Sequence, residues 1–129
     1  MQVTSLDHLV LTVRDLGATI SFYEILGLTH ELFTGTDGQE RHALTFGCQK
    51  INLHEEGKSF LPHAKEPRPG SADFCFLTDM RAEDWLAYLR EHEIEVDEGP
   101  VARTGATGPL MSVYVRDPDG NLIELAWQM

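Results

Sequence analysis

Residues 6–16, LDHLVLTVRDL, decide the fold, because residues 72–80, ADFCFLTDM, repeat their pattern later in the chain. Each segment is typical of a β-strand that runs into an acidic helix N-cap, Asp15 in the first copy and Asp79 in the second. A pattern written twice indicates a repeated structural unit. The sequence therefore predicts two similar modules.

Each copy of this segment is followed by a helix and three short strands. The stretch ISFYEILG predicts the first helix, which Gly27 ends, and AEDWLAYLREH predicts the second. The strands are expected at about 28–33, 41–46 and 50–55 in the first half, and at about 94–102, 110–116 and 122–127 in the second. Both halves thus have the order β-α-β-β-β.

A stretch rich in proline, glycine and charge, EEGKSFLPHAKEPRPGS, joins the halves and is typical of a linker. The chain is therefore expected to form one α+β domain over residues 1–129, with module 1 at about 3–55, the linker at 56–71 and module 2 at about 72–127. Neither module is large enough to close a core alone. We expect them to pack with curved sheets enclosing a cavity and helices outside.

The composition excludes several classes of partner. The 129 residues are 42% hydrophobic and include 10 Lys and Arg against 21 Asp and Glu, a net charge of −11, which argues against nucleic acid and anionic membrane surfaces. The sequence has no signal peptide and no apolar run of membrane-spanning length. Cys48 and Cys75 are expected to be buried strand thiols, and a soluble, cytoplasmic protein is predicted.

Strand alternation places a set of polar side chains on the predicted cavity face. His8 opens the first strand, where Leu9 and Leu11 point toward the helix and leave His8 on the other side. Asp73 holds the equivalent position in the second copy, so it is expected on the same face. The last strands align as INLHE and IELAW, which makes Asn52 the equivalent of Glu124 and puts His54 two residues further on.

The segment DPDGNLIEL, residues 117–125, carries Glu124 inside an apolar strand that follows a type I turn. The alternation directs Glu124 away from the face that packs on the helix. Such a carboxylate is either solvated at a sheet surface or offset by a metal or a base.

Imidazole nitrogen and carboxylate oxygen together suit a divalent first-row metal. We therefore predict one metal ion, Ni, Zn, Mn or Co, held by His8, His54, Asp73 and Glu124. Asn52 is the alternative to His54, although an amide oxygen is the poorer ligand beside an imidazole.

The doubled pattern, the opening DHLVLTVRDL with FYEILGL after it, and the closing VYVRDPDGNLIELA together resemble the vicinal oxygen chelate superfamily of glyoxalases, fosfomycin-resistance proteins and extradiol dioxygenases. Within it, QKINLHEEG, EPRPGSADFCF and GPVARTGATGP look like the glyoxalase domain-containing protein 5 group, some bacterial members of which are labelled virulence proteins. The resemblance implies metal ligands from the first and last strands of each module. These are His8, Asn52 or His54, Asp73 and Glu124.

Two departures from the superfamily pattern bear on the reaction. Asp73 stands where fosfomycin-modifying enzymes and extradiol dioxygenases place a histidine, which weakens an iron(II) dioxygenase assignment. Asn52 and His54 stand where glyoxalase I commonly carries a glutamate, so the resemblance does not carry over its substrate.

The predicted function is a metal-dependent lyase or isomerase of glyoxalase type, acting on a small substrate with adjacent oxygens through a metal-stabilised enediolate. Glu124 is the candidate base, and Arg103, in a loop that closes over the site, is the candidate partner for an anionic substrate group. A homodimer is expected. The alternatives are a protein that sequesters a small molecule without turnover and a metal-dependent dioxygenase.

Overall fold

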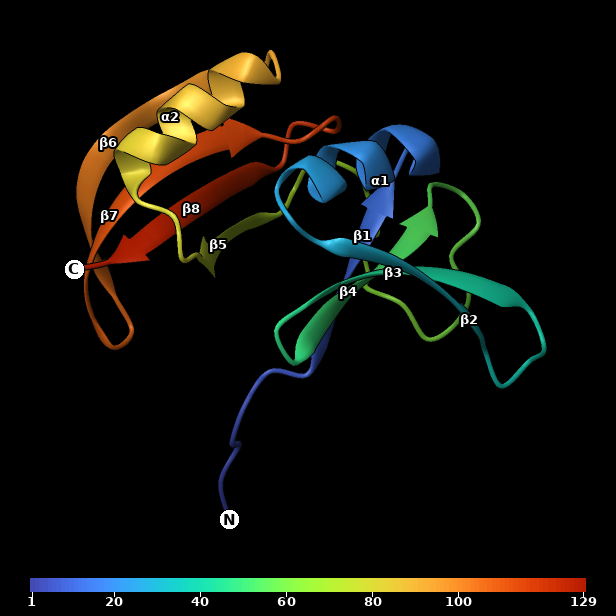
Figure 1. Cartoon of the computed structure of the whole chain (residues 1–129). Helices are drawn as coiled ribbons and strands as arrows, with labels where there is room; N and C mark the ends of the chain where they lie inside the picture. The colour runs from blue at the N-terminus through green and yellow to red at the C-terminus, as the bar shows by residue number, and fades with distance from the viewer. The chain divides into compact units, whose positions relative to one another are not determined.

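Both halves of the chain fold in the order that the sequence predicts, β-α-β-β-β, so the α+β class is confirmed (Figure 1). The computed structural model describes all 129 residues. They divide into two compact units, Met1–Gly70 and Ser71–Met129, each with a four-stranded mixed sheet and one helix of ten residues. Neither helix is long and apolar enough to cross a membrane.

Unit 1 consists of β1 (His8–Val13), α1 (Leu16–Ile25), β2 (Thr29–Thr34), β3 (Glu40–Phe46) and β4 (Gln49–Glu55). The strands lie in the order β1-β4-β3-β2, with β1 parallel to β4 and the other pairs antiparallel. One face of this sheet is apolar and buried, and Leu11 and Val13 on β1 contribute to it with Ile51 and Leu53 on β4. His8 belongs to the opposite face, as the alternation predicts.

Unit 2 repeats this arrangement with β5 (Asp73–Leu77), α2 (Ala82–Glu91), β6 (Val96–Gly105), β7 (Gly108–Arg116) and β8 (Leu122–Gln128). Its strand order is β5-β8-β7-β6, with β5 parallel to β8. Helix α2 lies over one face of this sheet and buries Trp85 and Leu89, while Ile123 and Leu125 are the buried residues of β8 that leave Glu124 on the other face (Figure 1).

The two helix N-caps behave differently. Asp15 caps α1 by accepting a hydrogen bond from the Ala18 backbone N–H at 2.9 Å, as predicted. The prediction of Asp79 as the second cap is wrong, since α2 has Arg81 at this position without a side-chain cap. The Thr78 hydroxyl accepts the Met80 N–H at 3.2 Å and the Trp85 indole N–H at 2.8 Å, and these bonds shape the entry to the helix instead.

The turn before β8 is hydrogen-bonded to the residue that precedes β5. The Gly120 N–H donates to the Asp117 carbonyl at 2.9 Å, which confirms the predicted turn. Asn121 is 1% exposed, donates from Nδ2 to Asp117 Oδ2 at 2.8 Å, and accepts the Ala72 N–H on Oδ1 at 2.8 Å. These bonds fix the register in which Cys75 lies opposite Glu124.

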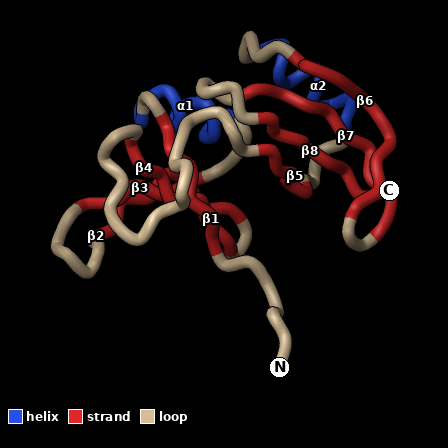
Figure 2. Tube along the Cα trace, turned by 180° about the vertical axis from the view of Figure 1, so that it is seen from behind, coloured by secondary structure: helices blue, strands red, loops and turns tan.

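A long stretch without helix or strand connects β4 to β5 (Figure 2). It returns to the sheet of unit 1, where the Phe60 ring contacts the imidazole ring of His54 and the guanidinium of Arg41. The linker that the sequence predicts is therefore partly packed on unit 1.

Candidate functional site

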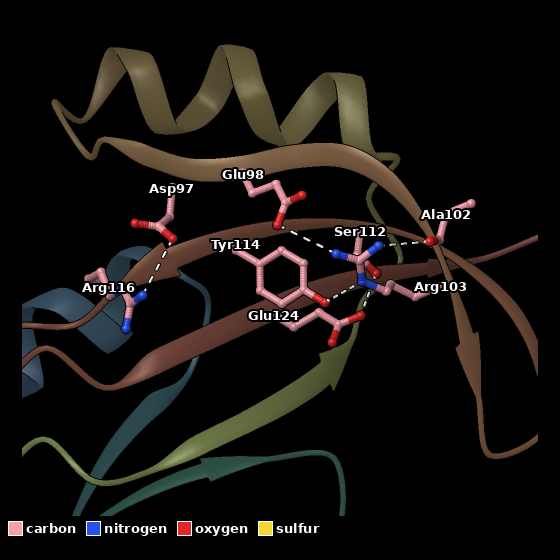
Figure 3. Close-up of polar contacts among 8 residues, drawn as sticks. All are labelled: Asp97, Glu98, Ala102, Arg103, Ser112, Tyr114, Arg116 and Glu124. Carbon is pink, nitrogen blue, oxygen red and sulfur yellow. Dashed lines mark hydrogen bonds and ion pairs between the residues drawn. The ribbon is translucent and has the colours of Figure 1, made fainter.

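Glu124 lies near the middle of β8, and Figure 3 shows it beside Ser112 and Tyr114 of the neighbouring strand β7. Ser112, on β7 and fully buried, donates its hydroxyl hydrogen bond to Glu124 Oε2 at 2.6 Å. Tyr114 is the register partner of Glu124 on β7, and Cys75 is its register partner on β5. One carboxylate oxygen is thus held in place by a donor inside the sheet.

Arg103 extends this cluster toward β6. Its Nε donates to the Tyr114 hydroxyl at 2.9 Å, Nη1 donates to the Ala102 carbonyl at 3.1 Å, and Nη2 lies 3.4 Å from Glu98 Oε2 (Figure 3). The sequence placed Arg103 in a mobile loop, and this is wrong, because β6 continues through Gly105 and only the short turn at 106–107 follows. The guanidinium is therefore held on a strand.

Desolvation and the charge of Glu124 raise the pKa values of its two neighbours, Cys75 and Tyr114. Partial desolvation of the thiol is the first cause that raises the pKa of Cys75 from 9.0 to about 11, although the residue as a whole is exposed, and the charge of Glu124 and a hydrogen bond with it add to the shift. Burial is also the main cause that raises the pKa of Tyr114, with the Arg103 hydrogen bond opposing it and Glu124 adding to it. At neutral pH both groups act as hydrogen-bond donors, so the proton acceptor of this cluster is Glu124.

Both cysteines differ from the sequence expectation of buried strand thiols. Cys48 lies in the turn between β3 and β4, and both side chains are exposed and free of disulfides. Cys75 and Phe76 lie on opposite faces of β5. Helix α2 covers the face of Phe76, which is buried, and leaves the face of Cys75 exposed.

Asp73 begins β5 on the same face as Glu124. It pairs with Leu122, two residues before Glu124 on β8, which corresponds to a spacing of about 7 Å along the strands. Its side chain is exposed. The two carboxylates of unit 2 that the sequence selects are therefore near one another.

His8 begins β1 at the matching position of unit 1. Its Nδ1 lies 2.8 Å from Asp7 Oδ2, and its side chain is 45% exposed. When Nδ1 carries the hydrogen of this bond, the lone pair of Nε2 is available to a metal, and histidine ligands commonly have such a carboxylate partner.

The register of unit 1 separates His54 from His8. His8 pairs with Lys50, so Asn52 is two residues further along the neighbouring strand and His54 is four, or about 7 Å and 13 Å along the strand. Asn52 Oδ1 is buried and has no hydrogen-bond partner in the protein. Asn52 is thus the nearer of the two alternatives to His8, and its carbonyl oxygen still lacks a partner.

Asn52 and His54 both line a cavity of about 500 Å³ that lies within unit 1. The cavity wall includes Phe33 from β2, Arg41 from β3 and Phe60 from the linker. Burial is the main cause that lowers the pKa of His54, and the charges of Arg41 and His63 lower it further. The imidazole is therefore neutral at neutral pH. Sequence reasoning did not find this cavity, because Phe60 reaches it from a segment without regular structure.

No three His, Cys, Asp or Glu side chains converge as a metal-binding group within either unit. The four ligands predicted from sequence are divided between the units, with His8 and His54 in unit 1 and Asp73 and Glu124 in unit 2. Each pair shares one face of its own sheet.

Comparison with known proteins places this geometry in a family. Residues 5–125 match the Glyoxalase/Bleomycin resistance protein/Dioxygenase superfamily. The chain is 55% identical to the glyoxalase domain-containing protein RDO1 of Mycosarcoma maydis over 126 residues, which cover 98% of this chain and 69% of that protein. It is 51% identical to the virulence protein STM3117 of Salmonella typhimurium over 127 residues, covering 98% of this chain and 85% of that protein.

Solved structures agree with these sequence matches. The crystal structure of STM3117 superposes with a TM-score of 0.91 at 49% identity and covers the whole of both chains. A lactoylglutathione lyase from Agrobacterium tumefaciens superposes with a TM-score of 0.69 at 27% identity, covering 98% of this chain and 96% of that one.

Proposed function

Because the chain belongs to the Glyoxalase/Bleomycin resistance protein/Dioxygenase superfamily, we propose that it is a divalent-metal-dependent lyase or isomerase of glyoxalase type. Its substrate would be a small molecule with adjacent oxygen atoms. The observation that carries this proposal is the carboxylate of Glu124, held by Ser112 at 2.6 Å beside two groups that stay protonated. The likeness to a lactoylglutathione lyase supports the same class of reaction.

The donor set of the chain fits a first-row divalent ion such as Ni, Zn, Mn or Co. We propose His8, Asp73 and Glu124 as ligands, with Asn52 or His54 as the further ligand from unit 1. The His8–Asp7 bond and the unpartnered Asn52 oxygen support this assignment. When bound, the metal would polarise both substrate oxygens, acidify the neighbouring C–H and stabilise the negative charge of the enediolate.

Glu124 would remove the proton from the substrate carbon and return it to the adjacent position. The Ser112 hydrogen bond orients the carboxylate through Oε2, which leaves the lone pairs of Oε1 for proton transfer or for the metal. The Cys75 thiol and Tyr114 hydroxyl cannot take this role while protonated. They would instead donate hydrogen bonds to negative charge on this face.

Arg103 would orient an anionic group of the substrate. Its bond to Tyr114 and its ion pair with Glu98 hold the guanidinium on the strand, and its side chain is 37% exposed, so it remains accessible. A group bound there would be positioned on the same sheet face as Glu124.

We further propose that the protein is cytoplasmic, that residues 1–129 form one domain, and that the active form is a homodimer. Analytical ultracentrifugation at micromolar concentration tests the assembly, and a single monomeric species would contradict it.

Proton exchange tests the proposed reaction. Hydroxyacetone is incubated in D₂O with the protein, with added Ni²⁺ or Zn²⁺ and with chelator, and deuterium in the carbon-bound positions is followed by NMR. The proposal expects metal-dependent incorporation that Glu124→Gln abolishes. Binding of the compound without any exchange would favour sequestration, and metal-dependent oxygen consumption would favour a dioxygenase.

A further inference from the structure

We propose that the cavity in unit 1 selects the substrate by binding an uncharged aryl or similarly bulky apolar group next to its reacting oxygens. That the bound molecule is a substrate rests on the proposed function. That the cavity binds such a molecule does not. The cavity lies entirely within unit 1, and its volume of about 500 Å³ is in the range of small-molecule sites. It is larger than a methyl-substituted dicarbonyl compound requires.

Phe60 is the residue that shapes this cavity. The Arg41 guanidinium lies 4.0 Å from the centre of its ring, and the His54 ring centre lies 4.8 Å from it. Arg41 is itself anchored by an ion pair with Asp37. Phe60 is thus clamped between a cation and an imidazole, which holds the linker on the sheet although the ring remains 43% exposed.

The wall of the cavity is mainly aromatic and apolar. Phe33 and Phe60 provide two rings, and Leu53, Leu61 and Pro62 add aliphatic surface. Aromatic walls favour a flat apolar ligand through both area burial and ring–ring contacts. The bound group is therefore expected to be a ring or a branched alkyl group.

The charges at the wall do not call for a charged ligand. Asp37 offsets the charge of Arg41, and the face of that guanidinium is already covered by Phe60. The His54 imidazole lies on the cavity wall and can exchange one hydrogen bond with a hydroxyl or carbonyl group. A carboxylate on the ring would meet a cation whose charge Asp37 already offsets.

Phe60 also borders a second cavity of about 220 Å³. The walls of both cavities include Arg41, His54 and Phe60. Truncation of the Phe60 ring should therefore join the two spaces. The size of the group that the protein accepts would then increase.

Binding without turnover tests this inference. The affinities of 2-hydroxyacetophenone and hydroxyacetone for the full chain are compared by NMR titration, with and without chelator, and benzyl alcohol serves as a ring probe without adjacent oxygens. We expect the phenyl compound to bind about tenfold tighter than the methyl compound, and benzyl alcohol to bind in the presence of chelator. Equal affinity for the phenyl and methyl compounds would overturn the inference.

The Phe60→Ala variant makes the test specific to the cavity. It should remove most of the preference for phenyl over methyl and shift the preference toward the 2-naphthyl analogue. Leu32→Ala is the matched control, because Leu32 is 53% exposed on the same sheet but is not part of the cavity wall, and it should change neither preference. An unchanged size preference in folded Phe60→Ala would contradict the inference. Selective ring binding without any proton exchange would contradict only the proposed reaction.

Discussion

Ser112 donates its hydroxyl hydrogen bond to Oε2 of Glu124 at 2.6 Å across the β7–β8 pair, although Ser112 is fully buried. This contact joins a donor that has no access to water with the carboxylate that we propose as base. It explains how Glu124 can be orientated before any substrate binds. Bonds to a charged acceptor are among the stronger hydrogen bonds in proteins.

Substitution Ser112→Ala should therefore lower both activity and stability. Removing a hydrogen bond to a carboxylate is expected to cost about 1–3 kcal/mol of unfolding free energy. The rate of metal-dependent proton exchange should fall by roughly 10-fold, which is common when a metal-binding side chain loses the residue that is hydrogen-bonded to it. Urea unfolding and the NMR exchange assay measure the two effects.

Thr104→Ala is the control for Ser112→Ala, because Thr104 is exposed on β6. It should change stability by no more than about 0.5 kcal/mol. Full exchange activity in Ser112→Ala would show that this bond does not position the base.

We expect the Cys75 thiol to lower the free energy of unfolding as the pH rises into the alkaline range. Its thiol has a pKa of about 11 in the folded chain and about 9 when unfolded, so the unfolded state loses the proton first as the pH rises. The stabilisation from this group is complete below pH 9 and is lost between about pH 9 and 11. Cys75→Ser should therefore reduce the decline in stability between pH 8 and pH 10.5.

Cys48→Ser is the matched control for this experiment, since Cys48 is the second free and exposed cysteine. Its urea unfolding at the two pH values should follow that of the unmodified chain. Equal alkaline destabilisation of both variants and the parent would exclude Cys75 as the cause.

Asn121 is predicted to be a structural residue of unit 2. The substitution Asn121→Ala removes two hydrogen bonds, the one that Asn121 accepts from the Ala72 N–H and the one that it donates to Asp117 Oδ2. The expected loss is about 2–4 kcal/mol of unfolding free energy, because the Asn121–Asp117 bond is buried and the Asn121–Ala72 bond is partly buried. The exposed Gln128→Ala is the control, and a loss below about 1 kcal/mol in Asn121→Ala would contradict the assignment.

Much of the fold could be predicted from sequence because its signals are local and repeated. Strand alternation placed Leu11 and Val13 on the helix face and His8 on the other, and the register later paired Val10 with Asn52 just as it paired Cys75 with Glu124. The repeat alignment had made Asn52 and Glu124 equivalent, and this is confirmed by the pairing.

The features that could not be predicted depend on contacts between residues that are far apart in the sequence. Ser112 is only a small polar residue in an apolar strand until β7 and β8 are paired, so its bond to Glu124 carries no sequence signal. Phe60 reaches His54 and Arg41 from an irregular segment. The prediction of Asp79 as the cap of α2 was wrong, because the Thr78 hydroxyl accepts the hydrogen bonds at the start of this helix.

Metal binding by Glu124→Gln tests the central claim most directly. Metal-free wild type and variant are first compared by urea unfolding, and then Ni²⁺ and Zn²⁺ are titrated calorimetrically into each. Glutamine keeps the shape of the side chain and an oxygen that can accept the Ser112 hydrogen bond, so the metal-free stabilities should agree within about 1 kcal/mol. The account predicts that metal affinity falls by roughly 10-fold or more. Unchanged affinity in the folded variant would contradict it and leave Glu124 as a structural carboxylate on the open face of the sheet.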